Sequence, residues 1–95
     1  MAPQQSGPPA PQPPQSLVLY RSSTCGWCRR VERLIGALEI DVEYRDRGQP
    51  EFRAELVSAT GSSQVPCLFI DGTPLLESAA IIDWLERYQA AIPEA

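Results

Sequence analysis

Two residues separate Cys25 from Cys28 in the segment Cys25-Gly26-Trp27-Cys28. An apolar strand candidate over residues 17–20 precedes this segment, and an apolar pattern with helical spacing follows it. Cys25 is therefore expected at the start of a helix, where unpaired backbone N–H groups and the helix dipole favour a thiolate over a thiol. Two thiols at such a junction suit thiol–disulfide exchange.

The residue types that are missing narrow this chemistry further. The chain has no His, and all eight of its cationic side chains are Arg. A Ser–His or Cys–His nucleophile pair is therefore impossible, as is any zinc site with a His ligand. Only Cys67 remains as a third thiol, too few for a four-cysteine site, so we expect no metal. We expect Cys67 to be a small buried apolar side chain, with a third active thiol as the alternative.

The first half of the chain supplies the elements around the cysteine pair. Residues 17–21 are predicted to form a strand, and residues 26–39 a helix with one apolar face. Val42 and Tyr44 alternate with polar residues, which is typical of a half-buried strand. A second helix is predicted to begin at Pro50. Its apolar contact line consists of Phe52 and Leu56.

The second half predicts a hairpin followed by a helix. Residues 67–70 form an apolar strand, Asp71-Gly72 a tight turn, and residues 75–76 an antiparallel edge strand. Ser78 is expected to cap the last helix. The apolar face of that helix consists of Ile81, Trp84, Leu85 and Tyr88. The order β-α-β-α-β-β-α predicts an α/β fold with a mixed four-stranded sheet and helices on both faces, its first two strands parallel.

Composition predicts one domain and a tail. Residues 1–16 lack charged side chains and are rich in Pro and Gln, so we predict that they are disordered, whereas residues 17–95 suffice for one core. The net charge of −4 argues against nucleic acid and anionic membranes as partners. No segment has the length and apolarity of a membrane span, and no secretory signal is recognised. Together with the three cysteines, this predicts a cytoplasmic, reducing location.

The element order, the cysteine pair and the later Val65-Pro66 together resemble a glutaredoxin over residues 17 to about 90. The resemblance implies a thioredoxin-like fold in which Pro66 follows a cis peptide bond and lies beside the cysteines. It also implies that the N–H and C=O of Val65 pair with glutathione or an extended peptide. Arg21 stands beside the position where the family usually has Lys, and Gln64 stands where it usually has Thr, so the resemblance implies that both contribute to the glutathione site.

A second resemblance concerns the start of the last helix. The segment from Glu77 to Ile81, Glu-Ser-Ala-Ala-Ile, is similar to a signature in the N-terminal domain of glutathione transferases. There the Glu and Ser hold the γ-glutamyl end of glutathione, which implies that Glu77 binds its ammonium and Ser78 its carboxylate. A transferase needs an added helical domain, and the chain ends at Ala95, so we expect no transferase activity.

These observations predict a glutathione-linked thiol–disulfide oxidoreductase that acts as a monomer on protein disulfides or glutathionylated proteins. Cys25 would be the nucleophile and Cys28 the resolving thiol, with Arg21, Arg29 and the helix start favouring the Cys25 thiolate. We expect Trp27 to form an exposed rim of the glutathione site. Three alternatives stay open: a thioredoxin-type reductase as electron source, a non-catalytic module that binds glutathione or a peptide, and an iron–sulfur cluster shared between two chains.

Overall fold

The computed structural model of the chain describes residues 7–93. Four strands and three helices follow one another in the predicted order. Their bounds are β1 (Leu17–Arg21), α1 (Gly26–Leu38), β2 (Glu43–Asp46), α2 (Pro50–Thr60), β3 (Cys67–Ile70), β4 (Thr73–Leu76) and α3 (Ser78–Ala91).

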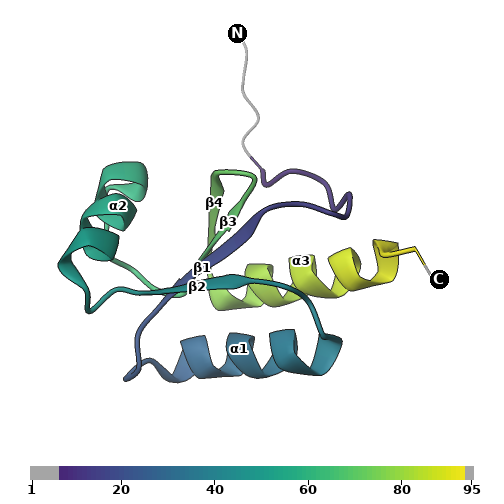
Figure 1. The fold of residues 1–95 in the computed structure, drawn as a ribbon, viewed down its shortest axis with the longest axis horizontal. Helices are drawn as coiled ribbons and strands as arrows, with labels where there is room; N and C mark the ends of the chain where they lie inside the picture. The colour runs from purple at the N-terminus through teal and green to yellow at the C-terminus, as the bar shows by residue number, and fades with distance from the viewer. Residues whose placement is uncertain (1–6, 94–95) are drawn as a thin grey trace, which may run out of the picture.

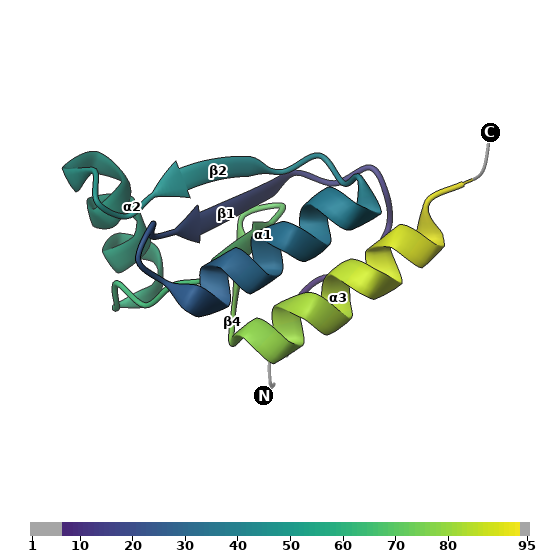
Figure 2. The same cartoon turned by 90° about the horizontal axis from the view of Figure 1, so that it is seen from below.

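The strands form one mixed sheet in the order β2-β1-β3-β4. β1 and β2 are parallel, whereas β3 is antiparallel to both β1 and β4. Helices α1 and α3 lie side by side on one face of the sheet, and α2 lies on the other (Figures 1 and 2). The α/β fold with helices on both faces of a mixed sheet is therefore confirmed, and it is thioredoxin-like.

The main core lies between the sheet and the pair α1 and α3. The residues of α3 buried in it are the predicted apolar face, Ile81, Trp84, Leu85 and Tyr88. On the apolar face of α1, Val31 and Ile35 are buried. A smaller cluster beneath α2 contains Tyr20, Leu56 and Cys67. The Tyr20 hydroxyl donates to Oε1 of Glu55 at 2.7 Å, which ties α2 to the sheet.

Three local predictions differ from the structure. Tyr44 lies on the edge strand β2 and is 45% exposed instead of half-buried, because no further strand flanks it. The first helix ends at Leu38, since Glu39 adopts a left-handed φ of 57° and closes the helix end. Ser78 does not cap α3: Glu77, with φ 78°, occupies the cap position and makes no side-chain cap hydrogen bond, and Ser78 is the first helical residue.

The Pro-rich segment over residues 7–16 runs along α3 to the start of β1. Nε1 of Trp84 donates to the carbonyl of Pro9 at 2.8 Å, and the backbone N–H of Gln15 donates to the Tyr88 hydroxyl at 3.0 Å. Ser16 donates its N–H to the Asp71 carboxylate at 2.9 Å. The division into a disordered tail and a domain stays a prediction, and residues 1–6 lie outside the described part of the chain.

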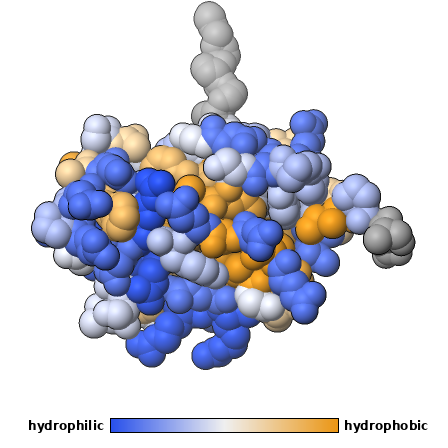
Figure 3. Space-filling view, viewed as in Figure 1, coloured by the Kyte–Doolittle hydropathy of each residue, from blue (hydrophilic) through white to orange (hydrophobic). Residues whose placement is uncertain are grey.

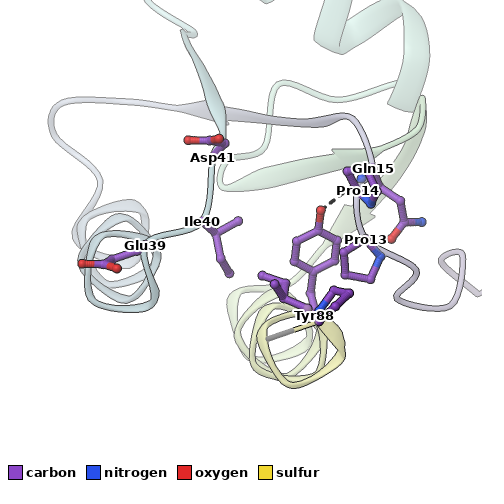
Figure 4. Close-up of a pocket in the computed structure, with 9 residues that line it drawn as sticks. Pro13, Pro14, Gln15, Glu39, Ile40, Asp41 and Tyr88 are labelled. Carbon is purple, nitrogen blue, oxygen red and sulfur yellow. Dashed lines mark hydrogen bonds between the residues drawn. The ribbon is translucent and has the colours of Figure 1, made fainter. Parts of the chain in front are cut away.

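A cavity of about 470 Å³ separates this segment from the carboxyl end of α1. Figure 4 shows the Tyr88 ring between Pro13 on the segment and Ile40 on the opposite wall, and the hydroxyl is bonded to Gln15. A hydrophobic area appears on the same side of the molecule in Figure 3. The Pro-rich segment therefore forms one wall of this cavity, and Tyr88 of α3 forms another.

No helix among residues 7–93 combines the length and the apolarity needed to cross a membrane.

Candidate functional site

The Cys25 sulfur caps helix α1. Cys25 has extended backbone dihedrals, and its Sγ accepts the backbone N–H of Cys28 at 3.1 Å. The first turn of α1 contains no acidic residue that would compete for the exposed N–H groups. Because a cap position presents N–H donors and the positive end of the helix dipole, it suits an anionic sulfur. Cys25 is also partly exposed, so a disulfide can reach it.

Cys28 occupies the opposite environment one turn further on. Its side chain is fully buried, and burial, with a smaller contribution from its hydrogen bond to Cys25, raises the pKa of the Cys28 thiol to about 12. Cys28 therefore stays a thiol at neutral pH. The two cysteines share one motif but differ in access: Cys25 is partly exposed, and Cys28 is buried.

This contrast predicts selective alkylation. Treating the folded, reduced protein with iodoacetamide at pH 7 is expected to modify Cys25 and to spare Cys28 and Cys67, because a thiol with a pKa near 12 is ionised in only about one molecule in 100,000 at that pH. Fragmentation of the tryptic peptide that carries both motif cysteines locates the label. In denaturant all three cysteines should react. Equal labelling of Cys25 and Cys28 in the folded protein would contradict the description of Cys25 as the accessible thiol and Cys28 as the buried one.

Val65-Pro66 faces the cap. The peptide bond between them is cis, as the resemblance implies, and the Val65 carbonyl lies 3.9 Å from Sγ of Cys25. Within residues 7–93 the N–H of Val65 has no hydrogen-bond partner. An extended ligand that paired with both polar groups of Val65 would therefore run directly past the reactive sulfur.

The strand register brings Glu77 and Ser78 to the same edge. β3 and β4 pair Cys67 with Leu76, so the residues just beyond them, Pro66 and Glu77, face each other across the ladder. Glu77 is exposed and has a φ of 78°, a conformation that is strained for a residue other than Gly. Strain of this kind is often retained at functional sites, and here it lies where α3 begins, across the ladder from Pro66.

The remaining predicted residues lie around this centre in different roles. Trp27 is 59% exposed, and the Arg30 guanidinium lies 5.6 Å from its ring centroid. Gln64 is exposed and donates its N–H to the Ser62 hydroxyl at 2.9 Å. Arg21 instead turns to carboxylates: it pairs with Glu32 at 2.8 Å and with Asp46 at 2.9 Å. Its contact with glutathione stays a prediction.

Cys67 is fully buried below the site, and burial raises the pKa of its thiol to about 11. This environment agrees with a packing role. Among the described residues, no group of three or more Cys, Asp or Glu side chains is arranged to hold a metal ion.

A polar cavity next to the site was not anticipated from the sequence. It has a volume of about 490 Å³ and is lined by Arg47, Arg53 and Ser63, together with the turn at the start of α2. Arg47 donates to the carbonyl of Ser63 at 2.9 Å, two residues before Val65. The sequence does contain a signal for this cavity: Arg47 and Arg53 flank Pro50, the first residue of a predicted helix.

Comparison with known proteins matches the family model for glutaredoxin over residues 17–75. A glutaredoxin of Pseudomonas aeruginosa is 37% identical over 58 residues, which are 60% of this chain and 69% of that protein. The crystal structure of a buckwheat glutaredoxin–glutathione complex superposes with a TM-score of 0.64 at 23% identity, covering 83% of each chain. At that identity the structural likeness shows the fold alone.

A probable maleylacetoacetate isomerase of Caenorhabditis elegans is 32% identical over 79 residues. These residues are 81% of this chain but only 36% of the relative, so the chain spans about a third of that protein's length.

Proposed function

Because this chain belongs to the glutaredoxin family, we propose that it is a glutathione-linked thiol–disulfide oxidoreductase with Cys25 as nucleophile. One observation carries the proposal. The Cys25 sulfur accepts an N–H at the start of α1 and at the same time faces the exposed backbone of Val65. A helix-capping sulfur and a backbone N–H without a partner in the described part of the chain thus lie close together, which supports attack on a disulfide bound along Val65.

The reaction follows from this geometry. The Cys25 thiolate attacks the glutathionyl sulfur of a protein–glutathione mixed disulfide, the old S–S bond breaks, and the substrate leaves as a thiolate that takes up a proton. Cys25 is left in a disulfide with glutathione. A second glutathione thiolate attacks the glutathionyl sulfur, which releases oxidised glutathione and restores the Cys25 thiolate. One glutathione is therefore consumed per substrate: the protein thiol is released, and the disulfide bond passes from the substrate to oxidised glutathione.

Stabilising the Cys25 thiolate helps the second step more than the first. A more stable thiolate is more abundant but less nucleophilic, and the two effects nearly cancel. As a leaving group, however, a stable thiolate departs faster. The helix cap therefore favours release of Cys25 from its mixed disulfide.

Three features around the sulfur support the placement of glutathione in this proposal. Its cysteinyl backbone would pair with Val65, whose N–H is available. Its γ-glutamyl end would meet Glu77 and the N–H groups that begin α3. Its glycyl carboxylate would enter the polar cavity beside Arg47 and Arg53.

The proposal extends to surroundings and partners. All three cysteines are free thiols, as a reducing compartment such as the cytoplasm would keep them. Glutathionylated proteins would be the partners, and the chain would act as a monomer.

Turnover with a glutathionylated peptide tests the proposal. The protein is mixed with the peptide, glutathione, glutathione reductase and NADPH, and NADPH consumption is followed. Protein-dependent turnover is expected. Activity only with thioredoxin reductase would identify another electron source and contradict the glutathione link. Binding of glutathione without turnover in either assay would favour the non-catalytic module.

A second candidate is a glutathione-dependent isomerase or transferase. It is favoured by the 32% identity to the probable maleylacetoacetate isomerase, which extends over 81% of this chain. The Glu-Ser-Ala-Ala-Ile segment that begins at Glu77 is a second feature in favour, because it is similar to a glutathione transferase signature. Incubation with glutathione and maleylacetoacetate tests this candidate, and isomerisation by the protein without net consumption of glutathione would support it.

A further inference from the structure

Three arginines on α1 stand apart from the other charges of the protein. Arg29, Arg30 and Arg33 are exposed, and none of them forms an ion pair within residues 7–93. The arginines that do form ion pairs there are Arg21, Arg45 and Arg87. In a chain with a net charge of −4, these three unpaired cations make a local surface of opposite sign.

Their position does not stabilise the helix that carries them. Arg29 and Arg30 lie within the first five residues of α1, where the helix dipole disfavours positive charge, and Arg33 lies near the middle of the helix, where the dipole has little effect. The last turn of α1, where cations would be favourable, contains no basic residue. The placement is therefore better explained by an external anion than by helix stability.

A continuous groove runs along this face. A hollow of about 440 Å³ is lined by Gly26 and the three arginines. A second hollow of about 340 Å³ shares two of those arginines and continues over the apolar side chains between α1 and α3. These side chains are Leu34, Ala37 and Ile82. Figure 2 shows the two helices side by side.

The groove begins next to the reactive sulfur. Gly26 follows Cys25 directly, and Ala37 lies eleven residues further along α1. At 1.5 Å per residue the groove is about 16 Å long, enough for about five residues of extended peptide. A substrate cysteine bound at Cys25 would therefore have its flanking residues within reach of the groove.

We propose that this groove docks an acidic segment of the protein substrate, with carboxylates against Arg29, Arg30 and Arg33 and an apolar side chain at the Leu34–Ile82 end. The inference rests on the proposed function, because it specifies the substrate class of the same site. A protein segment fits better than a nucleic acid, because the groove is short, its far end is apolar, and the chain as a whole is acidic.

Matched peptides test the docking surface. Two peptides each carry a single glutathionylated cysteine in the same sequence context. One has a tail rich in Asp and Glu with one Leu, and in the other Lys replaces each acidic residue of that tail. We expect kcat/KM to be about tenfold higher for the acidic peptide at low salt, mainly through KM, and the preference to shrink as salt rises. Equal kcat/KM values for the two peptides would overturn the proposal.

The variant Arg33→Glu and its control Arg87→Glu separate docking from net charge. Both change the charge by the same amount, but Arg87 lies on α3 and pairs with Asp83. Arg33→Glu should remove the preference for the acidic peptide, whereas Arg87→Glu should keep it. If both variants lost the preference for the acidic peptide equally, the preference would be a long-range effect of net charge and the docking proposal would fail. If the native protein bound an oligonucleotide more tightly than the acidic peptide, the proposed class of partner would be wrong.

A small substrate distinguishes the failure of this inference from failure of the proposed function. The mixed disulfide of glutathione and 2-mercaptoethanol has no tail, so the native protein and Arg33→Glu should reduce it equally well. If neither reduces it, the proposed function fails. Fluorescence anisotropy of the labelled acidic peptide then measures docking alone, with weaker binding to Arg33→Glu as the expected result and unchanged binding as the contrary one.

Discussion

Replacing the nucleophile, Cys25→Ser, is expected to lower kcat/KM for a glutathionylated peptide by at least about a thousandfold. A serine hydroxyl is almost wholly protonated at neutral pH, and it cannot form the disulfide through which the electrons pass. The helix cap would survive, because the serine oxygen accepts the Cys28 N–H as the sulfur does now. The loss would therefore report chemistry, not a damaged fold, and circular dichroism and the unfolding midpoint check this.

Cys28→Ser and Cys67→Ala are the matched cysteine controls. Cys28 is buried and stays protonated because its pKa lies near 12, so it is a slow nucleophile toward the Cys25–glutathione disulfide at neutral pH. External glutathione should then perform the second step, and Cys28→Ser should keep most activity on glutathionylated peptides. Activity on a protein disulfide should fall further, because a bulky substrate shields its mixed disulfide with Cys25 from external glutathione, and Cys28 acts there from within the same chain.

Cys67→Ala should leave turnover nearly unchanged, since Cys67 lies in the cluster beneath α2. A Cys25→Ser protein that still turned over the glutathionylated peptide would disprove the assignment of the nucleophile. A Cys67→Ala protein that lost activity while keeping its stability would reveal the third thiol as part of the site.

The order of the elements and their buried faces could be predicted because they depend on local spacing. The stripe around Trp84 repeats at helical intervals, and Asp71-Gly72 has the positive φ values of 49° and 88° that its turn requires. The Val65 edge beside Cys25 followed only from a family resemblance, because forty residues separate the two in the sequence. Spacing alone carries no information on such a contact.

Features that depend on contacts between elements distant in the sequence could not be predicted from local spacing. Tyr44 alternates like a half-buried residue, but its exposure depends on β2 being the edge strand. The ion pairs of Arg21 could not be foreseen either, because Glu32 and Asp46 come from two other elements; the contact of Arg21 with glutathione stays a prediction. The arginine-lined cavity beside Ser63 joins residues from a turn, a helix and a loop, so no single stretch of sequence shows it.

Removing residues 1–14 is expected to destabilise the domain, although composition marks these residues as a disordered tail. The deletion takes away Pro9, whose carbonyl accepts the indole N–H of Trp84 at 2.8 Å. The deletion removes this hydrogen bond and uncovers the indole, which has no exposed surface in the full chain, and loss of the hydrogen bond costs about 0.5–1.5 kcal/mol. Loss of Pro13 and Pro14 from the wall beside Tyr88 exposes further apolar surface.

Urea unfolding of three chains measures this effect. Deletion of residues 1–6 serves as the control, because it keeps Pro9 and every contact described for the segment. The longer deletion should lower the unfolding midpoint and the shorter one should not.

A double-mutant cycle with Trp84→Phe isolates the indole contact. This substitution should lower the free energy of unfolding more in the full chain than in the 1–14 deletion, because only the full chain has the Pro9 acceptor to lose. Equal midpoints for the two deletions would show that the segment adds nothing to the fold, and its contacts with α3 would then be too weak to hold it in place.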